Sequence, residues 1–278
     1  MIERFAQFPK ALADRTRRAT LAGVPALIAH PDWKSRAPVM LWMHGRTVSK
    51  ELDPGRYLRW IRAGIAAVAL DLPGHGERFD AELQKPERVL DIVARMLPEI
   101  DLVVDALADP AWHDILDFDR MGLGGMSAGG MAALRRLCEG HDFACAAVEC
   151  TTGWLEGLFL PGEAGGGRPP WNLSGDLQRL KDLDPMSHLP GWNPLPVLLL
   201  STQTDRLVPF ATVTRFVDRL REHYAAKGAD PSLAELQSWR DTGAPEEHAG
   251  FGRFGNDAKN AQVEFLRAHL VRRPTDPA

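Results

Sequence analysis

The sequence predicts one α/β domain, residues 1–278, built around a mostly parallel, doubly wound sheet. Short apolar segments alternate with amphipathic segments, an order typical of strands joined by crossover helices. Several apolar segments have almost no polar residues, as in strands that helices cover on both faces. At 278 residues the chain is long enough for one such domain. The predicted strands are Leu21–Ala29, Val39–Met43, Ile65–Asp71, Met121–Met126, Ala144–Cys150, Val197–Thr202 and Leu236–Asp241.

Three amphipathic segments are predicted to form the main helices. The first is Val89–Leu107, where apolar residues recur at positions i, i+4, i+7 and i+8. Pro98 lies inside this pattern and lacks a backbone donor, so we expect a kink or a break there. A second apolar face runs over Val213–Leu220 and a third over Val263–Leu270.

One long interval, from about residue 151 to 195, interrupts the alternation of strands and helices. An interval of this length in a compact domain usually has structure or a function of its own. Ligands bind at the carboxyl ends of the strands in open α/β sheets. We therefore expect a small cap, with Trp154, Leu158 and Phe159 lining an apolar substrate pocket. The alternative is that the interval packs on the sheet away from the site.

The composition argues against several classes of protein. A net charge of −4 with 25% charged residues leaves no basic excess for binding nucleic acid. No apolar run is long enough to cross a bilayer, and residues 1–10 contain no apolar core of a signal peptide. Cys138, Cys145 and Cys150 lack C-x-x-C spacing and are expected to be reduced, buried thiols. We expect a cytoplasmic protein with no nucleic-acid or membrane partner.

The pentapeptide Gly125–Gly129, Gly-Met-Ser-Ala-Gly, lies between a predicted strand and a helical segment. A serine at a sharp strand-to-helix turn has an exposed Oγ, and small neighbours leave room for the strained backbone. Ser127 is therefore the predicted nucleophile. The alternative is an ordinary serine in a glycine-rich surface turn.

A serine hydroxyl needs a base to accept its proton and an acid to orient that base. Asp205 follows a buried predicted strand, and His248 lies after the last predicted strand and before the last helix. These two residues are the predicted acid and base. Glu149, at the end of another strand, and Asp184 are alternative acids. Asp205 could instead form a turn or cap the following helix.

An oxyanion formed at the serine needs two hydrogen-bond donors. The backbone N–H of Ala128 directly follows the nucleophile and is the first predicted donor. The second is expected in the loop Met43–Thr47, where Gly45 allows a close approach and Arg46 supplies the N–H. The Arg46 side chain points either into solvent or toward an anionic part of a substrate.

Four segments, in this order, resemble the α/β-hydrolase superfamily. They are Met43–Arg46, the D-x-P-G-H-G-x-R segment Asp71–Arg78, the turn at Ser127, and Asp205 followed by His248. The resemblance covers most of the chain and implies an α/β-hydrolase fold with a Ser-Asp-His triad. The sequence is most similar to small bacterial esterases near the dienelactone-hydrolase and prolyl-oligopeptidase-like branches. It differs from dienelactone hydrolase, whose nucleophile is cysteine, and it contains no propeller domain.

The resemblance and the residues together predict a carboxylesterase of small to medium esters, acting through an acyl-enzyme on Ser127. The chemistry requires neither a metal nor an organic cofactor, and the expected partner is a small-molecule ester substrate. An aminopeptidase or acyl-peptide hydrolase is the first alternative, because the same site can cleave amides. A non-catalytic binding protein that retained the fold is the second, although the complete set of catalytic side chains argues against it.

Overall fold

A single sheet runs through the computed structural model, which describes residues 8–160 and 177–271. Its strands lie in the order β1-β2-β4-β3-β5-β6-β7-β8. β2 pairs antiparallel with both β1 and β4, and every later pair is parallel, which confirms the predicted mostly parallel sheet. The strands are β1 Thr16–Leu21, β2 Val24–Ala29, β3 Ala37–Met43, β4 Ala66–Leu70, β5 Leu116–Met126, β6 Cys145–Glu149, β7 Val197–Thr202 and β8 Ala234–Trp239.

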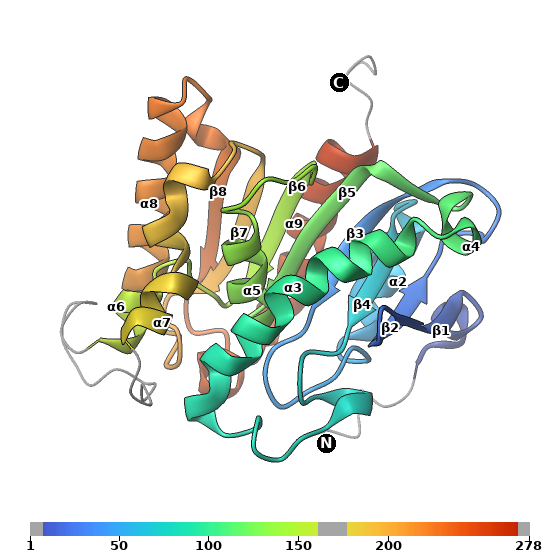
Figure 1. Cartoon of the computed structure of the whole chain (residues 1–278), viewed down its shortest axis with the longest axis horizontal. Coiled ribbons are helices and arrows are strands. Elements are labelled where there is room, and N and C mark those ends of the chain that lie inside the picture. The colour runs from blue at the N-terminus through green and yellow to red at the C-terminus, as the bar shows by residue number, and fades with distance from the viewer. Residues whose placement is uncertain (1–7, 161–176, 272–278) are drawn as a thin grey trace.

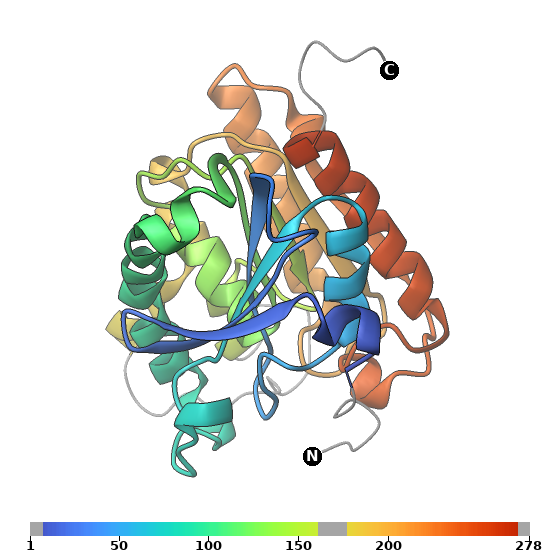
Figure 2. The same ribbon diagram turned by 90° about the vertical axis from the view of Figure 1, so that its right-hand side faces the viewer.

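Helices cover both faces of this sheet (Figures 1 and 2). α3, α5 and α8 pack on one face, and α1, α2 and α9 pack on the other. The sheet is therefore doubly wound, as predicted. The helices are α1 Lys10–Ala13, α2 Pro54–Arg62, α3 Val89–Leu107, α4 Pro110–His113, α5 Ala128–Arg136, α6 Leu155–Phe159, α7 Leu177–Leu183, α8 Phe210–Ala226 and α9 Gly255–Leu266.

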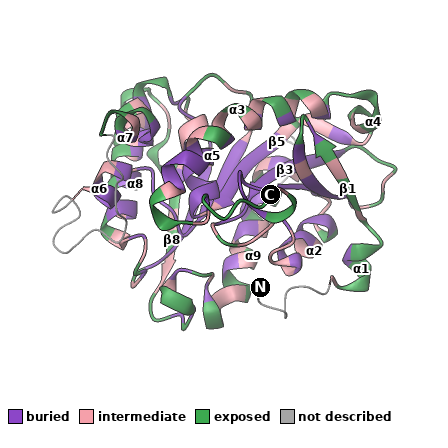
Figure 3. Ribbon diagram, turned by 60° about the horizontal axis from the view of Figure 1, so that its bottom comes forward, coloured by how far each residue is buried: buried purple, intermediate pink, exposed green. Residues whose placement is uncertain are grey.

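Successive side chains of the central strands pack into opposite hydrophobic layers. In β3, Val39, Leu41 and Met43 face the layer under α3 and α5, whereas Met40 and Trp42 face the layer under α2 and α9. All seven residues of the strand are buried (Figure 3). Burial on both faces explains why the strand reads as a continuous apolar segment in the sequence.

The N-terminal strand prediction was wrong in one respect. The segment Leu21–Ala29 is not one strand, because a tight turn at Ala22 and Gly23 divides it into the antiparallel pair β1 and β2. Both turn residues have positive φ, 47° and 85°, which suits a two-residue hairpin turn. The remaining predicted strands are present with ends shifted by no more than two residues, except that β5 begins at Leu116, five residues before the predicted start at Met121.

The long predicted helix is confirmed as α3, with both ends where the pattern placed them. It continues through Pro98 without the break that we expected as one possibility. Pro98 lies on the exposed side of α3, where water can satisfy the carbonyl that loses its donor.

The interval 151–195 contributes α6, α7 and a short 3-10 helix, Pro185–Gly191, to the described structure. These elements contact α3, α5 and α8, so the described parts pack beside the helices of one face. Residues 161–176 lie outside the described residues, and the cap therefore remains a prediction.

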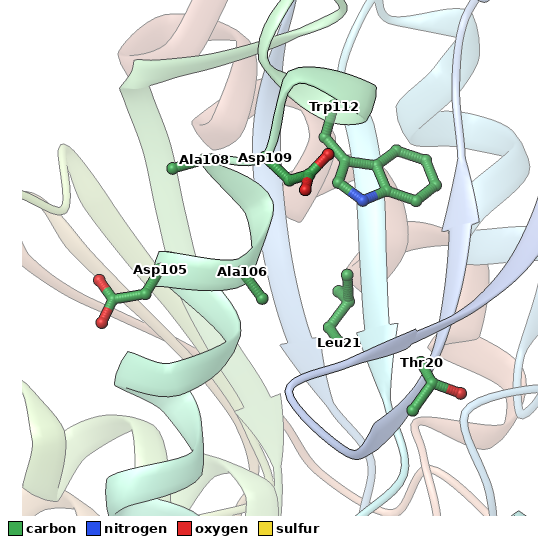
Figure 4. A pocket seen from close by; sticks show the side chains of 7 residues that line it. All are labelled: Thr20, Leu21, Asp105, Ala106, Ala108, Asp109 and Trp112. Atoms are coloured by element: carbon green, nitrogen blue, oxygen red, sulfur yellow. The ribbon is translucent and has the colours of Figure 1, made fainter.

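A groove of about 540 Å³ lies between β1 and the segment joining α3 to α4 (Figure 4). That segment leads into the beginning of β5, whereas Ser127 directly follows the end of β5. The groove is therefore distant from the predicted site. Its lining residues are Thr20, Leu21, Asp105, Ala106, Ala108, Asp109 and Trp112.

Two smaller observations concern the chain as a whole. Cys138, Cys145 and Cys150 are buried and form no disulfide, as the sequence predicted. Among the described helices, none is long and apolar enough to cross a membrane.

Candidate active site

Ser127 lies at a sharp turn between β5 and α5, with φ 51° and ψ −118°. Glycines surround it because the backbone is crowded. A Cβ on Gly125 would lie 2.5 Å from the carbonyl carbon of Gly129, and one on Gly129 would lie 2.4 Å from the Met43 carbonyl oxygen. Real Cβ contacts are longer than this, so the two outer positions of the pentapeptide admit only glycine.

The structure brings the three predicted catalytic side chains together in one hydrogen-bonded chain. Ser127 Oγ lies 2.9 Å from His248 Nε2, and His248 Nδ1 lies 2.8 Å from Asp205 Oδ2. Because an ionised carboxylate only accepts hydrogen bonds, Nδ1 carries the imidazole proton and Nε2 is left to accept the serine proton. All three residues are buried, with exposures of 4%, 7% and 8% for Ser127, His248 and Asp205.

Asp205 is held by the backbone that follows it. The N–H groups of Leu207 and Val208 both donate to Asp205 Oδ1, at 2.8 and 2.7 Å. The other carboxylate oxygen, Oδ2, is directed to His248. The two roles considered for this residue thus coincide, because one oxygen organises the turn and the other faces the imidazole.

The loop that carries His248 is braced by Glu247, a residue that the sequence did not single out. The Glu247 carboxylate accepts the N–H groups of Thr242 and Gly243, each at 2.7 Å. Hydrogen bonding from Thr242 lowers the pKa of Glu247, so the brace is ionised at neutral pH. The Glu247 carbonyl also accepts a hydrogen bond from Thr202 Oγ1, at the end of β7. The sequence gives no signal for such a brace, because nothing around Glu247 distinguishes it from a glutamate on the protein surface.

The loop that follows β3 lies against the nucleophile. A Cβ on Gly45 would be 3.4 Å from Ser127 Cβ, so the backbone passes directly beside the serine. His44 Nδ1 donates to the Gly45 carbonyl at 2.6 Å, and its Nε2 accepts the Leu72 N–H at 3.1 Å. The Arg46 side chain donates to the Gln84 carbonyl, so it is directed to a neighbouring loop and not to open solvent.

The D-x-P-G-H-G-x-R segment packs against the same loop through a buried ion pair. Lys50 Nζ lies 2.7 Å from Asp71 Oδ2 and 2.6 Å from Glu77 Oε1. Burial alone would raise the pKa of Asp71, but the hydrogen bonds that it accepts from the Lys50 ammonium and from the backbone N–H groups of Lys50 and Glu77 hold it well below its ordinary value. The segment therefore anchors the loop at the base of the site.

The two alternative acids are used elsewhere. Glu149 forms a buried pair with Arg56, at 2.7 Å between Oε2 and Nη2, and Gln262 donates to its other oxygen at 3.0 Å. Asp184 accepts the Leu155 N–H at 2.6 Å and the Ser187 hydroxyl at 3.0 Å. Neither carboxylate is among the hydrogen-bond partners of His248.

The three predicted pocket residues differ in their surroundings. Leu158 and Phe159 belong to the main hydrophobic core, with exposures of 0% and 3%. Trp154 is half-buried and packs against that core. The assignment of these residues to a substrate pocket remains a prediction. Within residues 8–160 and 177–271, no cluster of three or more His, Cys, Asp or Glu side chains could hold a metal ion.

The amino-acid sequence is similar to a known family and to a curated esterase. The sequence profile of the prolyl oligopeptidase family matches residues 97–270, more than half of the chain. The chain is 26% identical to the esterase YjfP of Escherichia coli over 257 residues, which cover 90% of this chain and 97% of the relative.

Solved structures show the same fold. TT1662 from Thermus thermophilus superposes with a TM-score of 0.69 at 22% identity, over 93% of this chain and 99% of that one. The acylaminoacyl peptidase of Pyrococcus horikoshii superposes with a TM-score of 0.69 at 16% identity, over 95% of this chain. The superposition covers 43% of that peptidase, so the chain spans less than half of its length.

Proposed function

Because the chain belongs to the prolyl oligopeptidase family, within the α/β-hydrolase superfamily of serine hydrolases, we propose that it is a carboxylesterase with Ser127, Asp205 and His248 as its catalytic triad. The observation that carries the proposal is the continuous chain of hydrogen bonds from Ser127 Oγ through His248 to Asp205. A strained serine, a neutral imidazole acceptor and a fixed carboxylate are the parts that acyl transfer requires.

The reaction begins when His248 Nε2 takes the hydroxyl proton and Ser127 Oγ forms a bond to the acyl carbon. The resulting oxyanion is bound by the backbone N–H groups of Arg46 and Ala128. His248 then gives its proton to the leaving alcohol, and the acyl group remains on Ser127. Water, activated by the same imidazole, hydrolyses the acyl-enzyme and restores the serine. Asp205 stabilises the imidazolium that forms in each half of the cycle.

An ester of a small or medium carboxylic acid is the proposed substrate. The esterase YjfP, similar over nearly the whole of both chains, supports ester cleavage. Apolar side chains near the end of β6, Trp154 among them, favour an uncharged acyl group. We further propose a cytoplasmic protein whose reaction requires no metal and no organic cofactor.

Amide cleavage is the second candidate, and the name of the matched family supports it. The family is named for an oligopeptidase, and the fold is shared with an acylaminoacyl peptidase. The same triad attacks both carbonyl types, so the two candidates differ in the leaving group that the pocket accepts.

A direct test compares p-nitrophenyl esters of increasing acyl length with aminoacyl p-nitroanilides. We expect ester hydrolysis and covalent labelling by a fluorophosphonate. Ser127→Ala should lower kcat by about 10⁴ to 10⁶ without a comparable loss of stability. A variant that keeps more than a tenth of the activity would exclude Ser127 as the nucleophile. Faster cleavage of the anilides would favour the peptidase candidate.

A further inference from the structure

The peptide group between Ser127 and Ala128 contains both a held carbonyl and a proposed oxyanion donor. The carbonyl belongs to Ser127 and the N–H to Ala128. A trans peptide group is planar, and its C=O and N–H point in opposite directions. Any contact that fixes the direction of the Ser127 carbonyl therefore fixes the direction in which the Ala128 N–H points.

Two hydrogen bonds hold this carbonyl. The Met131 N–H donates to it at 2.9 Å, as the first backbone bond of α5. The Thr151 hydroxyl also donates to it, again at 2.9 Å. The first bond is common to the start of any helix. The second comes from a different element, since Thr151 lies two residues beyond the end of β6.

Thr151 has little freedom to place its hydroxyl elsewhere. Its side chain is 2% exposed. A Cβ on Gly130 would lie 2.6 Å from Thr151 Cγ2, so the methyl group is packed directly on the first turn of α5. A β-branched side chain packed in this way is confined to one rotamer. The hydroxyl is thereby directed at the Ser127 carbonyl by packing.

The same segment holds the other side of the nucleophile. The Ser127 N–H donates to the Glu149 carbonyl at 2.9 Å. Residues 149–151 thus bind the backbone of Ser127 on both sides. Since φ of Ser127 is 51°, this conformation persists only where its surroundings determine it strongly.

We propose that Thr151 is a positioning residue of the oxyanion hole. Its hydroxyl fixes the plane of the Ser127–Ala128 peptide group and so directs the Ala128 N–H at the oxyanion. A hydrogen bond to the carbonyl also polarises the N–H of the same peptide group and makes it a stronger donor. The inference rests on the proposed function, in which the Ala128 N–H binds the oxyanion. The effect falls on the transition state, where the charge develops, and not on the bound substrate.

The test is Thr151→Val, which keeps the shape of the side chain and removes the hydroxyl. Removing an oxyanion donor outright costs about 10² to 10³ in kcat. A donor that is misdirected, but still present, should cost less, about 10-fold. We expect this loss in kcat for a p-nitrophenyl ester, with KM unchanged. The inhibition constant of a trifluoromethyl ketone, which forms an oxyanion on the serine, should rise by a similar factor. The pH–rate profile should not move, because the Asp205–His248 pair is untouched.

Thr151→Ser restores the hydroxyl and should keep kcat within about 3-fold of the wild type. Thr212→Val is a matched control, because Thr212 is a buried threonine whose hydroxyl donates to the Pro209 carbonyl at 2.7 Å and not to the backbone of Ser127. It should leave both kcat and the inhibition constant unchanged. If Thr151→Val does not fold, Thr151→Ala and Thr151→Ser supply the same comparison of variants with and without the hydroxyl.

Three outcomes would overturn the inference. They are a kcat for Thr151→Val within 2-fold of the wild type, an equal loss in Thr151→Ser, or a rise in KM alone. Failure of the proposed function has a different signature, since the wild-type protein would not hydrolyse the esters. The rate of fluorophosphonate labelling of Ser127 would then report on the oxyanion hole in the same set of variants.

Discussion

Asp184 should make the stability of this protein depend on pH in the opposite sense to an ordinary carboxylate. Its side chain is buried near the beginning of α6, where it accepts hydrogen bonds from Leu155 and Ser187. Burial, with a smaller contribution from the charge of Glu156, raises its pKa from 3.8 to about 6. The folded protein therefore retains this proton over a range in which the unfolded chain releases it.

The sign and size of the effect follow from linkage. Between pH 4 and 6 the folded state binds more protons at Asp184 than the unfolded state, so stability falls as the pH rises. The two pKa values differ by about 2, and each pKa unit corresponds to about 1.4 kcal/mol. The penalty for ionised Asp184 is then about 1 kcal/mol at pH 4.5 and about 3 kcal/mol at pH 7.5.

Asp184→Asn removes this penalty while keeping the shape of the side chain. The amide oxygen can still accept the Leu155 N–H, and the amide nitrogen can donate to the Ser187 hydroxyl. The free energy of unfolding is measured in denaturant for the variant and the wild type. We expect the difference in favour of the variant to be about 2 kcal/mol larger at pH 7.5 than at pH 4.5. Asp182→Asn, at an exposed neighbouring position, should show no such divergence. A difference between Asp184→Asn and the wild type that is constant with pH would refute the reasoning.

Three further predictions concern the site. Asp205→Asn should lower kcat by about 10³ to 10⁴. Glu149→Gln should mainly lower the free energy of unfolding, by up to about 3 kcal/mol, because the buried Arg56 then keeps only Asp53, 3.3 Å away, as an ionic partner. Kinetics and denaturant titrations that gave the reverse pattern would reassign the acid. The kcat/KM of the wild type should be lost at acid pH and rise as the pH increases, since only the neutral imidazole of His248 accepts the serine proton, and a profile with no such rise would exclude a histidine base. Trp154→Ala should shift the acyl length that the enzyme prefers, and an unchanged preference would place that side chain outside the pocket. Phe159→Ala should instead lower the free energy of unfolding by about 3–5 kcal/mol, because the ring is in the core.

The parts of the fold that the sequence predicted well are those where local pattern and tertiary burial agree. β7 is buried along its whole length and begins and ends where its apolar segment does, at Val197 and Thr202. α3 likewise follows its apolar periodicity from Val89 to Leu107. In both cases the signal is contained within the segment itself, so no knowledge of distant contacts is needed.

β1 was missed for the opposite reason. Thr16–Leu21 is an edge strand, and only Leu21 in it is buried. Its exposed positions, Arg17, Arg18 and Thr20, are polar and do not alternate with apolar residues, so neither an apolar run nor a period of two marks the strand. The turn after it is short, and Ala22-Gly23 interrupts the apolar pattern too weakly to separate two strands on pattern alone. The strand exists because β2 offers a pairing edge, which the sequence does not reveal.

The side chains proposed for catalysis could be chosen from sequence because each follows a strand end, and parallel strands bring their carboxyl ends to one edge. The residues that hold these side chains in place could not be chosen from the sequence. Arg56 and Glu149 are 93 residues apart, and nothing in either local sequence distinguishes a buried ion pair from two surface charges. Thr151 is equally inconspicuous, since its function depends on one carbonyl in a neighbouring turn.

The strained backbone near the nucleophile is held by hydrogen bonds that join three neighbouring strands. β5 and β6 lie side by side and are each followed by a residue with positive φ, Ser127 at 51° and Cys150 at 46°. Each such residue costs about 1–3 kcal/mol and persists only where its surroundings determine it. The Ser127 N–H is bound by the Glu149 carbonyl, and the Cys150 N–H by the Leu200 carbonyl in β7, each at 2.9 Å. Hydrogen bonds therefore connect the turn at Ser127 through β6 to β7. Because β7 also leads into Asp205, the strand that supports the nucleophile positions the acid as well, and the distance between them is set by the sheet and not by flexible loops.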